Sequence, residues 1–294
     1  MIYGKTITEP SIYGGNMKIS FSTLGCPDWS FNEIFATAKD LGYDGVEIRG
    51  VKNELYAPDI PEFRPQKLDE TLANLKRLGV SIPVLTTGIC VREYGSDETA
   101  DEQMRKDAAA YVALAGKLGS KYIRILGDKD IMPLGEVDDA RVGAAIKDFI
   151  ACSKDTGDAV FLLETNGVYG DTSRLVKIVE NIGDGRLAAL WDIHHPFRFF
   201  KEPVRKSYDN LAPHIKHVHA KDSVVLPENR AVKYKMTGKG DIPVREAAEL
   251  LRNKGYDGYI SLEWVKRWCA DLEAPGIVFV QYINYMRRLL KSSL

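Results

Sequence analysis

The sequence predicts a single α/β domain with the architecture of a (β/α)8 TIM barrel. Eight short β-rich segments alternate with amphipathic helical segments along nearly all of the 294 residues, and this alternation is typical of a closed parallel sheet surrounded by helices. Several helical segments end in a glycine that suits a left-handed cap, and a strand follows within a few residues. Gly-Tyr-Asp-Gly occurs at 42–45 and again at 255–258, which indicates a repeated βα unit.

A doubly wound sheet is the alternative fold for such a pattern. That fold would carry a glycine-rich phosphate-binding loop after its first strand, and Thr-Leu-Gly-Cys-Pro-Asp at 23–28 is no such loop. The barrel is therefore favoured. We expect residues 1–16 to be an N-terminal extension and residues 17–294 to form one barrel domain.

The expected elements follow from hydrophobic periodicity, which is two residues for strands and about 3.6 for helices. The strands are expected at Lys18–Leu24, Gly45–Arg49, Ile82–Thr87, Tyr122–Leu126, Val160–Glu164, Leu187–Asp192, Ile215–His219 and Tyr259–Glu263. The helices are expected at Ser30–Leu41, Gln66–Leu78, Glu102–Leu118, Asp139–Thr156, Thr172–Ile182, Val244–Lys254 and Ile277–Leu290. Ser30 and Glu33 have the spacing of a capping box, which starts the first helix.

Charge and composition restrict the class of partner. The 40 basic and 41 acidic residues give a formal net charge of −1, which provides no long-range attraction to nucleic acid or to an anionic membrane. No apolar run reaches the length of a membrane span, and residues 1–16 lack a signal-peptide pattern. The four cysteines are scattered, as free thiols in a reducing cytoplasm are. We expect a cytoplasmic protein that acts on a small molecule, and we leave open whether it forms a homo-oligomer.

Four consecutive strands of the predicted barrel end in a metal-ligating residue type. These residues are Glu164, Asp192, His219 and Glu263. In a (β/α)8 barrel the chemistry lies where strands end and βα loops begin, so the four side chains should meet at one rim. Three carboxylates close together would repel one another in a partly dry site, and a divalent cation removes that conflict. The sequence therefore predicts a metal site.

The donor set also indicates the kind of ion and site. Oxygen donors with one imidazole and no thiolate suit Mn²⁺ or Mg²⁺ best, and Co²⁺ or Zn²⁺ are compatible. Four protein ligands on an ion that prefers six leave two positions for water or for oxygens of a substrate. An open site of this kind favours catalysis over a structural role.

The seventh strand carries three of the five histidines, in Pro-His-Ile-Lys-His-Val-His-Ala-Lys-Asp at 213–222. Strand alternation places His217, His219 and Lys221 on one face. Because only His219 lies at the strand end, we expect it to be the single nitrogen ligand. His217 lies deeper on the same face, and we expect a core hydrogen bond to hold it.

Six motifs follow one another in this chain at the predicted strand ends and loops. They are Gly-Tyr-Asp-Gly-Val-Glu-Ile-Arg at 42–49, Leu-Glu-Thr-Asn at 163–166, Trp-Asp-Ile-His-His at 191–195, Val-His-Ala-Lys-Asp at 218–222, Gly-Lys-Gly at 238–240 and Ser-Leu-Glu-Trp at 261–264. In this order they resemble the xylose-isomerase-like TIM-barrel superfamily of sugar isomerases and epimerases, which includes inosose isomerases and dehydratases. The resemblance covers nearly the whole chain after Met17. It implies that the four strand-end residues hold the metal and that His195 contacts a substrate hydroxyl.

The activity implied is a divalent-metal-dependent sugar or keto-polyol isomerase or epimerase, which abstracts a proton next to a carbonyl and proceeds through an enediolate. Glu164 and Glu263 lie on strands on either side of the metal and are the expected acid and base, as well as ligands. Lys221 is expected to stabilise the developing oxyanion, or alternatively to form a salt bridge with Asp222 or a nearby glutamate.

Further residues are candidates for substrate binding. They are Glu47, Arg49, Arg124, Trp29, Trp264, Trp268 and Lys239. Glu47 and Arg49 share one face of the second strand, and pairing with other charges inside the barrel is their alternative role. Large aromatic residues at a rim bind a sugar face or simply pack. Lys239 lies in Thr-Gly-Lys-Gly at 237–240, which offers backbone amides to an anion or merely turns a loop.

Two positions depart from the ketose 3-epimerases of this superfamily. Those enzymes have a glutamate six residues beyond the first ligand and an arginine six residues beyond the metal histidine, where this chain has Gly170 and Val225. A free-ketose 3-epimerase is therefore less favoured, and a dehydratase or lyase acting on a keto-inositol or keto-glycoside is the alternative. A phosphodiesterase resembling abasic-site endonucleases, or a non-catalytic sugar-binding subunit, is favoured less, because the histidines are few and the carboxylates cluster.

Overall fold

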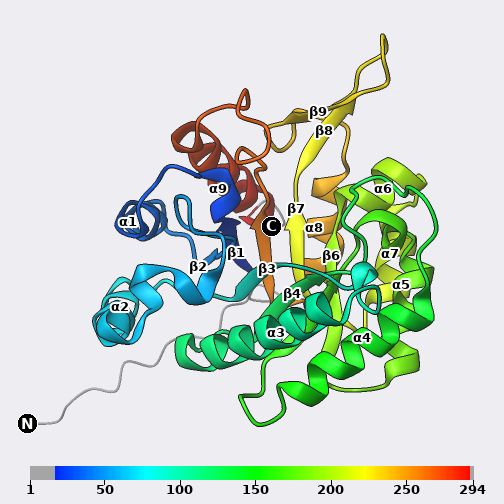
Figure 1. The fold of residues 1–294 in the computed structure, drawn as a ribbon. Coiled ribbons are helices and arrows are strands. Elements are labelled where there is room, and N and C mark those ends of the chain that lie inside the picture. The colour runs from blue at the N-terminus through cyan, green and yellow to red at the C-terminus, as the bar shows by residue number, and fades with distance from the viewer. Residues whose placement is uncertain (1–16, 292–294) are drawn as a thin grey trace, which may run out of the picture.

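The computed structural model describes residues 17–291 and shows a barrel of eight parallel strands inside a ring of helices (Figure 1). The strands are β1 Lys18–Ser22, β2 Gly45–Glu47, β3 Val84–Cys90, β4 Tyr122–Leu126, β5 Val160–Glu164, β6 Leu187–Asp192, β7 Ile215–Ala220 and β10 Tyr259–Leu262. They pair in the order β2-β1-β10-β7-β6-β5-β4-β3. The predicted fold and all eight predicted strands are confirmed. The expected extension, residues 1–16, lies outside the described residues.

Single backbone contacts, rather than a continuous ladder, close the barrel between β2 and β3. Val46 N–H donates to the carbonyl of Ser81 at 2.9 Å, and Thr86 N–H donates to the carbonyl of Ile48 at 2.8 Å. Isolated bridges join Gly45 to Ser81 and Ile48 to Leu85. We call this junction the seam.

Helices cover the outside of the barrel because their apolar faces pack on the outward side chains of the strands. They are α1 Phe31–Leu41, α2 Pro65–Leu78, α3 Glu98–Leu118, α4 Asp139–Cys152, α5 Thr172–Ile182, α6 His194–Phe200, α7 Val204–Leu211, α8 Val244–Asn253 and α9 Pro275–Lys291. Short 3₁₀ turns occur at Thr23–Gly25, Ala57–Asp59, Pro61–Phe63, Val91–Glu93 and Gly167–Gly170. Ser30 and Glu33 form the predicted capping box. No helix in the described part of the chain is long and apolar enough to span a bilayer.

Four elements were not predicted. α6 and α7 fill the connection between β6 and β7, and neither has a side-chain cap at its N-terminus that would mark its start in the sequence. After β7 the chain forms an antiparallel hairpin of β8 Asp222–Val225 and β9 Val232–Lys235, which extends beyond the barrel (Figure 1). The start of α3 also differs from the expectation, because Asp97 caps the helix at Thr99 and Ala100 and so moves its first residue to Glu98.

Strand alternation divides the core into two parts. Outward side chains of the strands join the helices in a large apolar cluster. Inward side chains form a small second cluster inside the barrel, made of Val84, Leu162, Ala188 and Leu190. Since inward positions recur every second residue, the next inward positions after Leu162 and Leu190 are Glu164 and Asp192. The apolar interior therefore gives way to carboxylates at the carboxyl ends of the strands.

Candidate active site

The four predicted ligands meet at the carboxyl ends of β5, β6, β7 and β10. One donor atom from each of Glu164, Asp192, His219 and Glu263 lies within 4.8 Å of the others, and all four side chains are buried. The register explains the meeting, because Asp192 pairs directly with His219 across β6 and β7 and Glu263 follows the end of β10. We call these four residues the quartet.

His219 presents one ring nitrogen to the other members of the quartet. Its Nδ1 atom lies 3.5 Å from Glu164 Oε1, 3.5 Å from Glu263 Oε1 and 3.9 Å from Asp192 Oδ2. This buried nitrogen has no hydrogen-bond partner among the described residues. Buried polar atoms are normally satisfied, so an unsatisfied ring nitrogen that faces three carboxylates fits a cation position.

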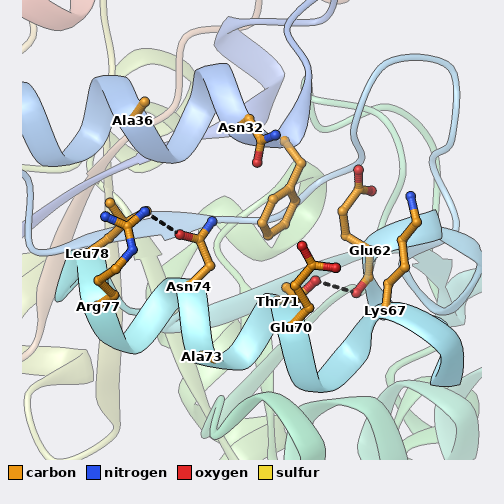
Figure 2. A pocket seen from close by; sticks show the side chains of 11 residues that line it. Asn32, Ala36, Glu62, Lys67, Glu70, Thr71, Ala73, Asn74, Arg77 and Leu78 are labelled. Carbon is orange, nitrogen blue, oxygen red and sulfur yellow. Dashed lines mark hydrogen bonds between the residues drawn. The ribbon is translucent and has the colours of Figure 1, made fainter.

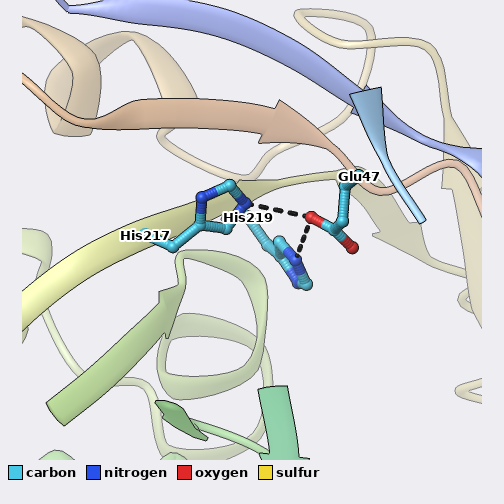
Figure 3. Close-up of side chains that lie close together, drawn as sticks. All are labelled: Glu47, His217 and His219. Carbon is cyan, nitrogen blue, oxygen red and sulfur yellow. Dashed lines mark hydrogen bonds and ion pairs between the residues drawn. The ribbon is translucent and has the colours of Figure 1, made fainter. Parts of the chain in front are cut away.

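Glu47 fixes the orientation of this imidazole from the opposite side (Figure 3). His219 Nε2 donates to Glu47 Oε2 at 2.9 Å, so the proton lies on Nε2 and the lone pair of a neutral ring lies on Nδ1, toward the quartet. Carboxylates that bind the second nitrogen of a metal-ligating histidine have the same effect. The charge of Glu47 is retained: burial acts to raise its pKa, but the charge of His219 and the hydrogen bonds from His217 and His219 hold the pKa well below its ordinary value.

His217 has the structural role that the sequence predicted. Its Nε2 donates to the same Glu47 oxygen at 3.0 Å, and Thr86 Oγ donates to the other Glu47 oxygen at 2.8 Å. Burial lowers the pKa of His217 despite the neighbouring carboxylate, which keeps the ring neutral. Figure 3 shows the two rings of β7 converging on the single carboxylate of β2.

Arg124 gives Glu164 its ionic partner. The Arg124 Nε atom lies 3.1 Å from Glu164 Oε2, and both side chains are almost completely buried. Burial acts to raise the pKa of Glu164, but the charge of Arg124 and the neighbouring imidazole of His219 hold it well below its ordinary value. Glu164 is therefore ionised, with one oxygen toward Arg124 and the other toward His219.

Lys221 forms ion pairs with two members of the quartet, Asp192 and Glu263. Its Nζ atom lies 2.7 Å from Asp192 Oδ2 and also pairs with Glu263. Burial acts to lower the pKa of Lys221, but the charges of Asp192 and Glu263 hold it well above its ordinary value. The ammonium group is therefore retained. The alternative of a salt bridge to a nearby glutamate is confirmed with Glu263, and the aspartate that pairs with Lys221 is Asp192 rather than Asp222.

The charges around the quartet fit a divalent cation. Four carboxylates (Glu47, Glu164, Asp192 and Glu263) outnumber the two side-chain cations that form ion pairs with them (Arg124 and Lys221). Burial acts to lower the pKa of His219, but the charges of Glu47 and Glu263 hold it well above 6.5, so a proton on the ring supplies part of the missing charge. A divalent cation among the mostly oxygen donors would supply all of it.

His195 presents a free nitrogen next to the quartet. Its Nδ1 donates to the carbonyl of Thr165 at 2.8 Å, and burial lowers its pKa despite the charge of Asp192, so the ring is neutral with its lone pair on Nε2. Nε2 is buried and has no hydrogen-bond partner among the described residues. The neighbouring His194 differs, because its Nε2 is hydrogen-bonded to Ser223 Oγ at 2.8 Å.

A cavity of about 430 Å³ opens above the quartet at the barrel mouth. Its lining includes the predicted residues Arg49, Arg124, Glu164, His195, Lys221 and Glu263. It also includes Trp268, which is 57% exposed, and Tyr234 of the unpredicted hairpin. The alternating Val-Lys-Tyr-Lys at 232–235 and the turn before it are the sequence signal for that hairpin. We call this space the mouth cavity.

Four predicted substrate contacts lie elsewhere, and these assignments are corrected. Glu47 is completely buried below the mouth cavity, where the two histidines of β7 occupy it. Trp264 is buried in the core and its Nε1 donates to the carbonyl of Glu273. Trp29 packs edge-on against Phe279. Lys239 is exposed on a loop whose backbone amides at 238 and 240 donate to Asp222 rather than facing an anion.

Two further hollows lie away from the quartet. One, of about 610 Å³, lies between α1 and α2 on the outside of the barrel (Figure 2). Its side chains are of mixed charge, with Arg77 bound to Asn74 and Thr71 bound to the carbonyl of Glu62. The other, of about 690 Å³, lies beside the mouth cavity and shares Arg49 with it. Of these three hollows in the described part of the chain, the mouth cavity is the one that reaches the quartet and the free nitrogen of His195, so it is the candidate active site.

Comparison with known proteins agrees with the strand-end motifs and with the barrel. The family model described as "Xylose isomerase-like TIM barrel" matches residues 35–287, which include every member of the quartet. The chain belongs to this family. The resemblance that the strand ends indicated is thereby confirmed.

Proteins similar to this chain match it over nearly its whole length. A fructoselysine 3-epimerase of Escherichia coli O157:H7 is 23% identical over 287 residues, which cover 93% of this chain and 98% of the relative. The crystal structure of a 3-keto-D-glucoside 4-epimerase from E. coli has a TM-score of 0.72 at 16% identity, and the match covers 92% of this chain and 99% of that one. The structure of the IOLI protein with a bound zinc atom has a TM-score of 0.73 at 14% identity, with 94% and 98% covered.

Proposed function

We propose that this protein is a divalent-metal-dependent epimerase or isomerase of a sugar or keto-polyol, which moves a proton at the carbon next to a carbonyl through an enediolate. The quartet is the observation that supports the proposal. Three carboxylates and one imidazole are gathered within 4.8 Å of one another, and two of the carboxylates also line the mouth cavity. A site built only to bind a sugar has no need of clustered carboxylates.

The donor atoms support one ion bound by Glu164, Asp192, Glu263 and His219 Nδ1. A divalent ion held there would polarise a carbonyl and stabilise the negative charge that develops on its oxygen. Mn²⁺ or Mg²⁺ is the expected ion because carboxylate oxygens dominate the donor set, and Co²⁺ or Zn²⁺ is compatible with the same donors.

Glu164 and Glu263 are the candidates for moving the proton. Both line the mouth cavity, and they come from strands on opposite sides of β6 and β7. Each directs one oxygen toward His219 and the other toward a cation. A carboxylate on each side of the substrate allows removal of the proton on one face and its return on the other, or its transfer to the neighbouring carbon. The first outcome is epimerisation and the second is isomerisation.

His195 and Lys221 are suited to hold the substrate for this step. The free Nε2 of His195 accepts a hydrogen bond from a substrate hydroxyl, because Thr165 already takes the proton on Nδ1. The charged Nζ of Lys221 lies between Asp192 and Glu263 at the cavity wall. From there it can donate to an oxygen that gains negative charge as the proton leaves.

The two departures from ketose 3-epimerases favour a substrate other than a free ketose. A Cβ atom at Gly170 would lie 2.7 Å from the ring of Phe200, so a longer side chain has no space there. Val225 is 38% exposed on the hairpin and does not line the mouth cavity. Neither position supplies the glutamate or the arginine that the 3-epimerase branch places at them.

A phosphodiesterase with a metal cluster has less support. Two other groups of potential ligands lie near the quartet, namely Glu47 with His217 and His219, and Asp192 with His194 and His195. In the first group Glu47 accepts from both histidines. In the second, His194 Nε2 is bound to Ser223 and His195 Nδ1 to the carbonyl of Thr165. The first group shares His219 with the quartet and the second shares Asp192 with it, so the three groups do not supply the three separate ligand sets that a three-metal cluster needs.

Proton transfer is tested by hydrogen exchange with solvent. Chelator-treated protein is loaded with Mn²⁺ and incubated in D₂O with ketoses, ketose phosphates, inososes and 3-keto-glycosides, and nuclear magnetic resonance follows deuterium at the carbon next to the carbonyl. We expect exchange and a new epimer or isomer for one of these classes. Glu263→Gln should lower the exchange rate at least ~100-fold, in the range of general acid–base catalysis. Glu246→Gln on the exposed side of α8 is the control.

Other outcomes would assign a different reaction to this site or would refute the proposed proton transfer. An elimination product in place of an epimer would identify a dehydratase or lyase with the same site. Metal-loaded protein that exchanges no proton in any class would refute the proposal, as would a Glu263→Gln variant with full exchange. Cleavage of an abasic duplex would restore the phosphodiesterase alternative.

A further inference from the structure

Arg49, at the end of β2, is a largely buried cation without an anionic partner. Its guanidinium carbon lies 5.9 Å from the centre of the Trp268 ring, and no close ion pair joins it to a carboxylate of residues 17–291, although the charge of Glu263 acts on it from a greater distance. Its alternative role, pairing with another charge, is therefore not observed. Burial and the charge of Arg124 lower the pKa of Arg49 to about 10, so the side chain remains protonated at neutral pH. An unpaired buried charge is costly.

Arg49 stands between two cavities. It lines the mouth cavity and also the neighbouring hollow of about 690 Å³ near the start of α3, which we call the side cavity. Gly88 lies at this junction, and a Cβ atom there would contact Arg49 at 3.5 Å. The walls of the side cavity combine apolar side chains, among them Leu55, Ile89 and Met104, with the carboxylates of Glu93 and Asp107.

Guanidinium groups bind carboxylates and phosphates in a bidentate manner. The mouth cavity by itself is large enough for a small molecule, and the side cavity next to it offers further space. We propose that Arg49 binds an anionic group carried by the substrate, and that an apolar arm next to that group occupies the side cavity. This inference rests on the proposed function, because it places the carbonyl end of the same substrate at the quartet. The substrate class is then a keto sugar conjugated to an acid, rather than a free neutral sugar.

Matched probes that differ only in charge test the anion. Fructosylglycine and its amide, fructosylglycinamide, have the same shape, and titration calorimetry on Mn²⁺-loaded protein measures the binding of each. We expect the acid to bind about 10- to 100-fold more tightly than the amide, as for a hydrogen bond to a charged group. Arg49→Gln should reduce this ratio to about one. Arg205→Gln removes an exposed guanidinium on α7 and should leave the ratio unchanged. Fructose 6-phosphate tests whether phosphate or carboxylate is the preferred anion.

The arm has its own test. Fructosylleucine adds an apolar side chain to fructosylglycine, and we expect it to bind about tenfold more tightly because roughly 1.5 kcal/mol accompanies burial of such a side chain. Ala100→Leu adds bulk to the wall of the side cavity at an exposed position of α3, so it should fold normally. It should abolish the preference for the leucine conjugate and retain the preference for acid over amide.

The results separate this inference from the proposed chemistry, because calorimetry reports the binding of a probe whether or not a proton is transferred. Acid and amide that bind equally, a ratio that survives Arg49→Gln, or probes that do not bind at all would each overturn the role of Arg49. A leucine preference that survives Ala100→Leu would remove the arm from the side cavity. Arg49-dependent binding together with no exchange on any sugar would keep this inference and refute the proton transfer.

Discussion

Replacement of Glu47 by glutamine tests whether the buried pair with His219 prepares the site for a cation. A glutamine has the same shape, and its carbonyl oxygen can still accept from both histidines while its amide faces the hydroxyl of Thr86. The variant therefore keeps the hydrogen bonds of 2.9 Å and 3.0 Å to the β7 rings and loses only the negative charge.

The magnitude follows from the kind of hydrogen bond that is lost. A hydrogen bond to a charged group contributes about 1.5–3 kcal/mol and one between neutral groups about 0.5–1.5 kcal/mol. The difference, about 1–1.5 kcal/mol, corresponds to a loss of roughly tenfold in metal affinity, at the lower end of the 10- to 100-fold range for residues behind a metal ligand. Titration of chelator-treated protein with Mn²⁺ measures this affinity.

His217→Gln is the matched control, because His217 donates to the same Glu47 oxygen but does not belong to the quartet. We expect its Mn²⁺ affinity to stay within about threefold of the wild type. The ¹⁵N shifts of the His219 ring should report a proton on Nε2 in the wild type with metal bound. If Glu47→Gln binds Mn²⁺ as tightly as the wild type, the positioning role of Glu47 is wrong.

Three further predictions concern metal, substrate and backbone. Chelation should lower the melting temperature, and Mn²⁺ at 100 times its dissociation constant should restore about 2.7 kcal/mol; identical melting curves would contradict a bound metal. His195→Asn should lower kcat/KM for the exchanging sugar about tenfold through the lost hydrogen bond, with Mn²⁺ affinity unchanged; a parallel loss of affinity would make His195 a ligand instead. Gly167→Ala should cost about 1–3 kcal/mol in urea denaturation, because φ is +54° and a Cβ atom would lie 2.4 Å from Asp128. The helical Gly116→Ala meets no neighbour and should instead stabilise the protein by about 0.4–1 kcal/mol.

The barrel and the quartet were predictable because both depend on local periodicity. An inward position recurs every second residue, so an apolar strand that ends in a carboxylate places it at the mouth whichever strand lies next to it. Asp192 and His219 could be assigned to one rim in this way without knowledge of their pairing.

Contacts that cross the barrel were not predictable. Glu47 and His219 are 172 positions apart, and the local sequence around one residue does not indicate that it contacts the other. Trp264 and Trp268 are four residues apart in one loop, yet one is buried and the other 57% exposed. The path of that loop, which hydrophobicity does not encode, decides between them. Tyr234 lines the mouth cavity from β9, which is placed there by its antiparallel pairing with β8.

The position of Glu47 at the seam links the ion site to local opening of the barrel between β2 and β3. Glu47 lies on β2 at the seam, holds Thr86 of β3 through one oxygen and holds β7 through the other. Separation of β2 from β3 would therefore displace the His219 ring that faces the quartet. An ion bound to that ring would oppose the separation. Local opening is read by amide hydrogen exchange. The amides of Val46 and Thr86, which cross the seam, should exchange more slowly when the quartet holds an ion, and they would report its occupancy before any substrate is known.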